Sequence, residues 1–496
     1  MTAANKTMIQ YFHWYTEGNG TLWQEVAGKA AWLAELGITA AWLPPAYKAA
    51  AGSASVGYDV YDLYDLGEFE QKGSIPTKYG NLEQYRSAIS ALRENHIQVI
   101  ADIVLNHKAG GDELETFEAV KVDPENRIKV ISDVINVEAF TRFTFPGRGK
   151  KYSAFEWNYE CFSGVDHIAG SDENAIYSIR NTWGDDWEEM IDIEKGNYDY
   201  LMFNDVEFRN PAVREELFQW GMWYLQHAGF DGVRLDAVKH ISPKFYNEWL
   251  HRLRTESKQE IFAVGEYWAP GLLPLLLKYA EATEEKMHLF DSSLQNNFHT
   301  ASVSGNEYDL RHIFDETFTI SKPSLSVTVV DNHDTQPLQA LEAPVEHWFK
   351  PLAYAFILLR QEGLPCIFYP DLFGASYTDK GKDGNDYEIF LDKVPALEAL
   401  LTARSTYAYG EQVSYFDHAN CVGWTRLGTE DRPGCAVLLS NGDEGHKHMS
   451  MGSQMANKVF IDWLGHRPEE IILNETGEGE FWVNAGSVSV WVEKKH

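Results

Sequence analysis

The chain has 496 residues, a hydrophobic share of 44% and a net charge of −32 at pH 7. This length is too great for one compact core, so two or three domains are expected, one of them large. The negative charge disfavours nucleic acid and anionic membranes as partners, and no apolar run reaches the roughly 18 residues that a membrane span needs.

Strands and helices alternate over the first part of the chain. Periodicity predicts strands at 8–12, 38–43 and 97–105 and helices at 22–36 and 81–94. Gly37 ends the first helix, and Asn81 is placed to cap the second. Asp102 lies within the third strand, while Asn106 and His107 follow its C-terminal end.

The alternation stops after His107. The segment 108–209 is rich in Gly, Asp, Asn and aromatic residues and contains short alternating stretches such as 130–137. A structureless loop of this length is implausible inside a compact domain. We therefore predict an inserted β-rich domain.

The alternation resumes at Asn210 and Pro211, a cap and a first-turn proline for a helix to about His227. Ser242 and Pro243 are predicted to open the next helix in the same way. Strands are then predicted at 230–236, 261–266, 287–294, 325–330 and 364–369, and further helices at 272–282, 310–318, 348–359 and 396–403.

Eight strands alternating with helices is the count of a (β/α)8 barrel. Beyond about Tyr409, short alternating runs separated by turn residues predict a terminal antiparallel β domain. The expected fold is an α/β (β/α)8 TIM barrel with an inserted β-rich domain after strand 3 and a C-terminal antiparallel β-sandwich. The predicted boundaries are 1–107 and 210–400 for the barrel, 108–209 for the insertion and 401–496 for the terminal domain.

Three predicted strands run apolar and then end in an acid. Arg234 and Asp236 alternate with Val233 and Leu235, so the two charges share one face of their strand. Glu266 ends the next strand, and Asp331 and Asp334 follow strand seven. A structural salt bridge would explain one isolated pair, since buried charges are usually paired. Acids at several strand ends instead indicate one site, which a βα-barrel assembles at its C-terminal face.

Four segments resemble the signature segments of the alpha-amylase family, glycoside hydrolase family 13: Asp102–His107, Gly232–His240, Gly265–Trp268 and Val330–Asp334. They occur in the family's order on strands three, four, five and seven. Gly196–Met202 and Gly486–Val490 are similar to the liquefying bacterial alpha-amylases and their intracellular relatives. The resemblance covers nearly the whole chain.

The resemblance implies that Asp236 is the nucleophile, Glu266 the general acid/base and Asp334 a third carboxylate that stabilises the transition state. In a retaining glycosidase, one carboxylate attacks the anomeric carbon and a second, protonated carboxyl donates to the leaving oxygen. The two groups then lie about 5 to 5.5 Å apart. Arg234 would keep Asp236 ionised and oriented, because an adjacent cation lowers the pKa of a carboxylate.

Substrate-binding residues are also implied by the resemblance. His107 and His333 would form hydrogen bonds with sugar hydroxyls beside the cleaved bond, although a histidine at a strand end is often structural. Tyr58 would stack on a glucose ring with its flat apolar face. The weaker candidates lie on the leaving-group side: Trp268, Lys239 and His240.

Calcium is the implied cofactor. The family places the ion between the inserted domain and the barrel, with the oxygen ligands that a hard cation requires. The matching positions are Asn106, Asp199, Asp205 and the backbone carbonyl of His240, with Asp166 and Asp186 as further acids. One calcium site is expected, and a second calcium or sodium ion stays open. Glu207 and Arg209 stand where liquefying enzymes tend to carry aspartates, which argues against a second calcium.

The leading hypothesis is retaining endo-hydrolysis of internal α-1,4 bonds in starch, glycogen or maltodextrin. A maltooligosaccharide-forming exo-enzyme or a transglycosylase on the same scaffold is the alternative. A catalytically inactive glucan-binding protein is a third possibility, which the presence of all three acids disfavours. The partner is thus an α-glucan, and we expect a monomer with no nucleic-acid or membrane partner.

The compartment is inferred from the cysteines and the N-terminal residues. The four cysteines, at 161, 366, 421 and 435, follow no disulfide or metal spacing, and no signal peptide is visible before the first strand. We therefore expect a cytoplasmic protein. A mature secreted chain whose signal peptide has been removed would have the same features.

Overall fold

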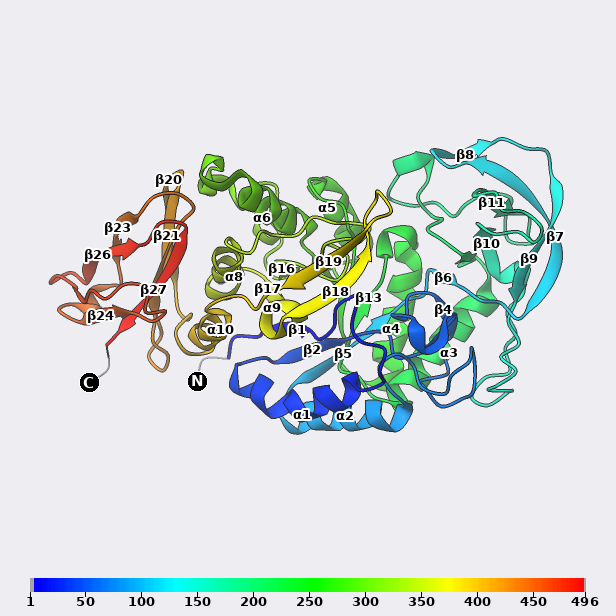
Figure 1. Cartoon of the computed structure of the whole chain (residues 1–496), viewed down its shortest axis with the longest axis horizontal. Helices are drawn as coiled ribbons and strands as arrows, with labels where there is room; N and C mark the ends of the chain where they lie inside the picture. The colour runs from blue at the N-terminus through cyan, green and yellow to red at the C-terminus, as the bar shows by residue number, and fades with distance from the viewer. Residues whose placement is uncertain (1–3, 495–496) are drawn as a thin grey trace.

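A closed barrel of eight parallel strands lies at the centre of the molecule (Figure 1). The computed structural model describes residues 4–494. The strands are β1 Met8–Gln10, β2 Ala40–Leu43, β5 Gln98–Ile103, β13 Gly232–Leu235, β14 Phe262–Gly265, β15 His288–Phe290, β16 Ser326–Val329 and β17 Leu364–Phe368, paired in the order β1-β17-β16-β15-β14-β13-β5-β2. The predicted fold class is confirmed.

Helices follow the barrel strands. They are α1 Leu22–Glu35, α2 Leu82–Glu94, α3 Pro211–His227, α4 Pro243–Ser257, α5 Leu273–Ala282, α6 Ser292–Ser304, α7 Phe318–Ser321, α8 Lys350–Leu359, α9 Tyr369–Phe373 and α10 Leu397–Thr406. Asn81 and Asn210 cap α2 and α3 as predicted. Ser242 makes no side-chain cap for α4. Its hydroxyl instead forms a hydrogen bond with Glu188 of the inserted segment.

The region around the sixth strand differs from the prediction. The strand spans only His288–Phe290, because the Asp291 side chain accepts a hydrogen bond from the Leu294 amide and begins α6 at Ser292. The helix predicted at 310–318 is a 3-10 turn at Leu310–His312 followed by α7. The first turn of α6 therefore lies within the predicted strand 287–294, and the rest of α6 is a helix that the prediction lacks.

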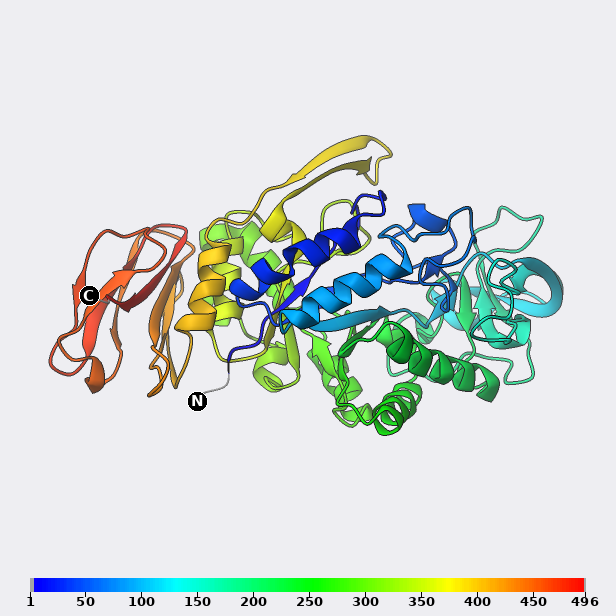
Figure 2. The ribbon, with the colours of Figure 1, turned by 90° about the horizontal axis from the view of Figure 1, so that it is seen from below.

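The inserted segment forms an antiparallel sheet, which lies beside the C-terminal ends of the barrel strands (Figures 1 and 2). Its strands are β6 His107–Lys108, β7 Glu113–Asp123, β8 Asn126–Val130, β9 Ile135–Arg142, β10 Phe162–Val165, β11 Ile176–Ile179 and β12 Asn204–Val206. The stretch 130–137 is not one alternating strand: it contains the last residue of β8, a connection at 131–134 and the first residues of β9. A short pair, β3 Lys48–Ala49 and β4 Val60–Asp62, lies in the loop after β2.

The C-terminal part has two antiparallel sheets at the opposite end of the molecule from the insertion (Figure 2). The larger contains β20 Gln412–His418, β21 Cys421–Arg426, β22 Cys435–Ser440, β24 Val459–Asp462, β25 Ile471–Ile472 and β27 Ser487–Glu493, and the smaller β23 Gly445–Ser450 and β26 Glu478–Val483. Met449 and Phe481 from the small sheet share a buried cluster with Phe460 and Trp491 from the large one. The exact domain boundaries stay a prediction.

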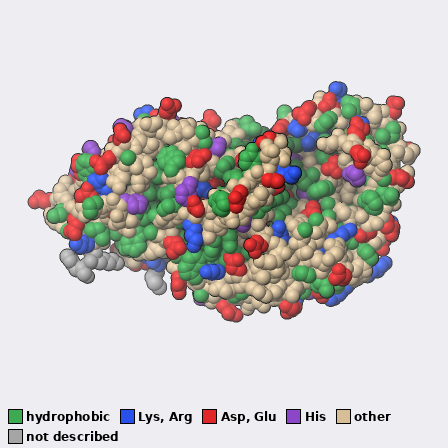
Figure 3. All heavy atoms as spheres, in the orientation of Figure 1, with side chains coloured by type: hydrophobic (Ala, Val, Ile, Leu, Met, Phe, Trp, Pro, Cys, Tyr) green, Lys and Arg blue, Asp and Glu red, His purple; other side chains and the backbone are tan. Residues whose placement is uncertain are grey.

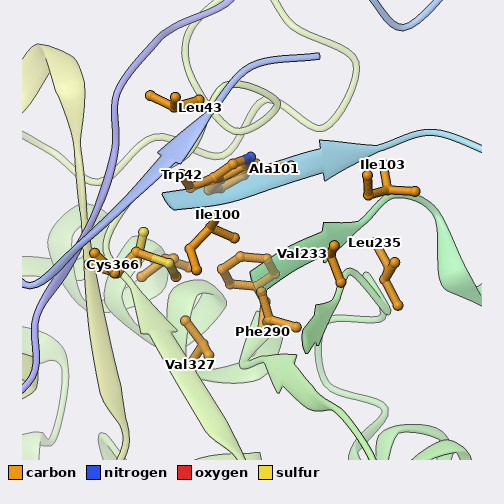
Figure 4. Packing of buried hydrophobic residues seen from close by; sticks show 14 of the residues in the cluster. Trp42, Leu43, Ile100, Ala101, Ile103, Val233, Leu235, Phe290, Val327 and Cys366 are labelled. Atoms are coloured by element: carbon orange, nitrogen blue, oxygen red, sulfur yellow. The ribbon is translucent and has the colours of Figure 1, made fainter. Parts of the chain in front are cut away.

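The inside of the barrel is filled by apolar side chains. Trp42 and Phe290 approach with ring centroids 5.4 Å apart, close to Ile100 (Figure 4). Val233 and Leu235 alternate with Arg234 along β13, so their side chains leave the opposite face of the strand from the guanidinium. Within residues 4–494, every helix falls short of the length and apolar character that crossing a bilayer requires.

A hairpin absent from the prediction extends from the barrel after α9. It contains β18 Ala375–Lys380 and β19 Asp386–Leu391. Figure 3 shows it beside a hollow in the surface between the barrel and the inserted sheet.

Candidate active site

The predicted acids meet because the backbone ladder of the barrel continues past the strand ends. Asp102 on β5 is the direct partner of Arg234 on β13. Beyond these strands, the Asp236 amide donates to the Ile103 carbonyl and the Glu266 amide to the Leu235 carbonyl, each over 2.9 Å. Adjacent strands therefore hold Asp236 and Glu266 next to each other at the C-terminal end of the barrel.

Arg234 joins these carboxylates through one buried guanidinium. Its Nη1 lies 2.7 Å from Asp236 Oδ1 and 2.9 Å from Asp102 Oδ1, and its Nη2 lies 2.5 Å from Glu266 Oε2. Asp334 completes the set, because its carboxylate forms a side-chain hydrogen bond with Glu266. We call Asp102, Arg234, Asp236, Glu266 and Asp334 the barrel-mouth cluster.

The pKa values within the barrel-mouth cluster are not equal. Burial raises the pKa of Glu266 to about 8, with additional contributions from the negative charges of Asp334 and Asp236. Burial also raises the pKa of Asp334 and Asp102 to about 6 each. The pKa of Asp236 is raised by burial too, while Arg234 opposes the shift. At neutral pH, Glu266 is therefore the group that retains a proton.

The backbone beside Asp236 is in a conformation that L-residues seldom adopt. Ala237 has φ of +47°, in the left-handed region, although it is not glycine. Its amide lies 3.4 Å from Glu266 Oε2. Strain of this kind persists where surrounding contacts enforce it, and it is common at functional sites.

Tyr58 and His333 lie beside the cluster as part of a wall of parallel rings. The Tyr58 hydroxyl donates to Asp102 Oδ2 over 2.8 Å, and its ring stacks with His333 at a centroid distance of 5.1 Å. His333 Nε2 is 3.5 Å from Asp334 Oδ2. Trp14, which sequence analysis did not select, is parallel to Tyr58 within 1° at 5.9 Å. It follows the C-terminal end of β1, so the rule that found the acids could have found it.

His107 forms a hydrogen bond with the loop that carries Tyr58. Its Nε2 donates to the Tyr58 carbonyl over 2.8 Å, so Nδ1 carries the lone pair. Burial lowers the pKa of His107 to about 4, which keeps the ring neutral. Nδ1 is buried and has no hydrogen-bond partner among the described residues. A groove of about 470 Å³ adjoins this point and is lined by Asp59, Lys108 and Phe203, among others.

Lys239, His240 and Trp268 lie on the side of the cluster where the inserted segment approaches. Lys239 Nζ is 3.3 Å from the Trp268 carbonyl and 3.7 Å from Asp192 Oδ2. His240 Nδ1 is 2.6 Å from the Tyr198 carbonyl, and burial lowers the pKa of His240 to about 3. These contacts join the end of β13 to the insertion.

A second group of buried acids lies between the barrel and the inserted sheet. Asn106 Nδ2 donates to Asp205 Oδ1 over 3.1 Å, and Ser163 donates to Asp205 Oδ2 over 2.5 Å. Asp199 Oδ2 accepts from the Glu188 amide over 2.9 Å. We call Asn106, Glu188, Asp199, Asp205 and Glu207 the interface cluster. Glu188 was missed because no motif or strand end marks it.

The other two predicted metal ligands lie differently. Asp166 is half-buried and accepts from the Phe203 amide over 2.9 Å, two residues before Asp205. Asp186 is 84% exposed in its side chain and pairs with Arg209 Nη1 at 3.1 Å. Arg209 also forms a fork with Glu207, through Nε at 2.8 Å and Nη2 at 2.7 Å. Asp186 is therefore linked to Glu207 of the interface cluster through Arg209.

The chemistry of the interface cluster suits a cation with oxygen ligands. Asn106 Oδ1 and Glu188 Oε2 are buried without hydrogen-bond partners among residues 4–494. Burial raises the pKa of Asp199 and of Asp205, and each is raised further by neighbouring acids. Across the described residues, no three His, Cys, Asp or Glu side chains converge closely enough to hold an ion. Amide and backbone oxygens would have to complete such a site.

Comparison with known proteins supports the barrel fold and shows which proteins this chain is similar to. The model of the alpha amylase catalytic domain matches residues 11–403. The chain is 49% identical to the cytoplasmic alpha-amylase of Escherichia coli (strain K12), over 98% of this chain and 99% of that protein. It is 44% identical to the glucan 1,4-alpha-maltohexaosidase of Bacillus sp. (strain 707), over 99% and 93% respectively.

A solved structure shows the same fold at low identity. The alpha-amylase of Geobacillus thermoleovorans, in complex with acarbose, aligns with a TM-score of 0.64 and 15% identity, covering 99% of this chain and 98% of that one. The family match covers most of the barrel and the whole insertion. The chain therefore belongs to the alpha-amylase family.

Proposed function

We propose that the barrel-mouth cluster hydrolyses internal α-1,4-glucosidic bonds with retention of configuration. Asp236 is the nucleophile, Glu266 the general acid/base and Asp334 the third carboxylate. The observation that carries this assignment is the Arg234 bridge: one guanidinium contacts both Asp236 and Glu266, while burial keeps Glu266 protonated near pH 7.

The reaction proceeds in two steps. In the first, an Asp236 oxygen forms a bond to the anomeric carbon while the glycosidic bond breaks, and Glu266 gives its proton to the leaving oxygen. In the second, Glu266, now a carboxylate, takes a proton from water. The water oxygen bonds to the anomeric carbon, and the bond to Asp236 breaks. Arg234 stabilises both carboxylates whenever they are charged.

The aromatic wall and the two histidines position the sugar. Tyr58 and Trp14 offer flat apolar faces against which pyranose rings can stack. His333 and His107 are neutral, so each can form hydrogen bonds with sugar hydroxyls without adding a charge. The free Nδ1 of His107 is an acceptor for such a hydroxyl. Lys239, His240 and Trp268 would contact the leaving-group side.

We further propose that the interface cluster holds one calcium ion. Asn106, Asp199, Asp205 and the backbone carbonyl of His240 are the ligands, with Asp166 close by. The bound cation neutralises the buried acids and joins the inserted sheet to the barrel. Asp186 is not included, because Arg209 already pairs with it. For the same reason, we do not include a second calcium or a sodium ion at Glu207.

The cellular compartment and the oligomeric state of the enzyme are also proposals. The four cysteines are free thiols and all are buried, which suits a reducing compartment, and the Escherichia coli relative is named as cytoplasmic. We propose a cytoplasmic monomer that acts on an α-glucan.

The decisive experiment uses a long linear α-1,4-glucan. Endo-cleavage should lower viscosity well before many reducing ends appear, and NMR should show newly formed ends first as the α-anomer. Glu266→Gln is the matched control. Reducing ends that accumulate while viscosity stays high would favour the exo-acting alternative, which the maltohexaosidase relative brings into consideration. Products with a β-anomer first would overturn the retaining mechanism, and absence of cleavage would overturn the function.

A further inference from the structure

The β18–β19 hairpin contacts Tyr15, a residue next to the aromatic wall of the site. The Tyr15 ring stacks on Tyr377 of β18 with a centroid distance of 3.8 Å and an interplanar angle of 13°. Its hydroxyl donates to Asp379 Oδ2 over 2.5 Å. The chain neighbour of Tyr15 is Trp14, whose ring forms the end of the wall with Tyr58 and His333.

The loop after β16 is tied to the same point. Gln339 Nε2 donates to the Tyr15 hydroxyl over 2.7 Å, and the Tyr377 hydroxyl donates to the Pro337 carbonyl over 2.9 Å. The Trp14 amide in turn donates to Gln336 Oε1 over 3.1 Å. The hairpin thus contacts both loops that flank the aromatic wall, one carrying Trp14 and the other following Asp334.

The two faces of the hairpin differ. Tyr377 is buried, and Asp379 lies on the same face by strand alternation. On the other face, Phe390 is 65% exposed and lies opposite Ser376, which is also exposed. The contacts with Tyr15 and Pro337 come from the face that carries Tyr377 and Asp379, and the tip borders the surface hollow (Figure 3). A ribbon of two strands is marginal alone, so these contacts fix its position.

We propose that Tyr377 and Asp379 are positioning residues that hold Trp14, through Tyr15, in the plane where it stacks on a glucosyl ring next to the one at Tyr58. The hairpin thereby sets how firmly the enzyme binds the glucan beyond the cleaved bond, and so influences product length. This inference rests on the proposed α-glucan activity. It assigns no chemical step to the hairpin.

The test compares substitutions on the two faces. Tyr377→Ala and Asp379→Ala should raise KM for a defined linear maltooligosaccharide about two- to tenfold, the range that an aromatic contact represents, with kcat little changed. The product profile should shift at the same time. Asp379→Asn keeps an acceptor for the Tyr15 hydroxyl and should restore most of the wild-type KM. Phe390→Ala on the outer face is the matched control and should behave as wild type.

Two results would show that the hairpin does not position Trp14. Unchanged KM and products in both inner-face variants would overturn the proposal, including when their melting temperatures fall, because a purely structural hairpin would produce that pattern. An equal effect of Phe390→Ala would also overturn it, since that side chain lies on the face away from Tyr15. If the wild type fails to cleave the maltooligosaccharide, the proposed function is wrong, which is a distinct result.

Discussion

The two buried acid clusters differ in where their positive charge comes from. In the barrel-mouth cluster, Arg234 contacts three carboxylates, and the pKa of Asp102 and of Asp334 stays near 6. In the interface cluster, no Lys, Arg or His within residues 4–494 pairs with Asp199 or Asp205. Their pKa values are raised well above the ordinary range.

This difference explains why one cluster suits catalysis and the other suits an exchangeable cation. A covalently attached guanidinium cannot dissociate, so it keeps the acids in fixed positions through a reaction cycle in which their charges change. Acids without such a partner are costly to bury in their charged form, and a bound ion offsets that cost only while it is present.

Glu266→Gln should reduce kcat by about 10²- to 10⁴-fold, because the amide cannot donate the proton to the leaving oxygen. Glu216→Gln is the matched control: burial also raises the pKa of Glu216, but that carboxylate binds Ser153 away from the cluster. Steady-state kinetics on a soluble glucan measure both. Full turnover by Glu266→Gln would refute the assignment of the acid.

Arg234→Lys should reduce kcat by roughly a hundredfold while the protein stays folded. The charge is kept, but a single ammonium cannot contact Asp102, Asp236 and Glu266 in the planar arrangement of the guanidinium. Lys239→Arg is a useful comparison, because the two ion pairs of Lys239 with acids of the insertion are long, at 3.6 and 3.7 Å. Wild-type kcat in Arg234→Lys would mean that charge alone suffices.

The strand-end acids could be predicted from sequence for a physical reason. Parallel strands end at one edge, so polar residues after Leu235, Gly265 and Val330 had to meet. The fold class followed from the same alternation of elements. The hairpin at 375–391 did not, although Tyr387, Ile389 and Leu391 alternate along it, because the ring of Tyr377 stacks on Tyr15, a residue distant in sequence.

The interface cluster was predictable only in part. Asn106 and Asp205, which the resemblance implied as metal ligands, are joined by a direct hydrogen bond. Asp186 was selected with them, yet its carboxylate is exposed and paired, because Arg209 folds back toward it. Sequence spacing gives no sign of the direction that a long side chain takes. Sequence spacing also gives no sign that the Ser242 hydroxyl forms a hydrogen bond with Glu188 and does not cap α4.

The pH dependence of kcat/KM should be bell-shaped. Glu266 must be protonated, and its pKa of about 8 predicts a tenfold loss per pH unit above that value. Asp334 must be ionised, and its pKa of about 6 predicts a loss as pH falls below that value. Asp334→Asn removes a negative neighbour that raises the pKa of Glu266, so the alkaline limb should move to lower pH. A limb that stays in place would contradict this coupling.

Removing the proposed calcium ion should lower the melting temperature by several degrees and leave the barrel-mouth cluster chemically intact. An ion present at a thousand times its Kd stabilises the folded state by about 4 kcal/mol, and chelation removes that contribution. Calorimetry with and without chelator measures the shift, and readdition of calcium should reverse it. Asp205→Asn should show a smaller difference between the two conditions. A chelated wild type with an unchanged melting temperature would exclude the proposed ion.

Arg209→Gln should give the smallest effect, about 2 kcal/mol of stability, because it leaves Glu207 buried without its cation while the Arg209 side chain is itself 24% exposed. It should also increase the loss of melting temperature on chelation, since the positive charge of Arg209, which interacts with Asp199, would be gone and the proposed calcium would offset more of the negative charge. Arg180→Gln is the matched control, with a side chain 23% exposed and an acid partner 77% exposed. Equal calcium dependence in both variants would mean that Arg209 stabilises Glu207 alone and contributes nothing to the interface cluster.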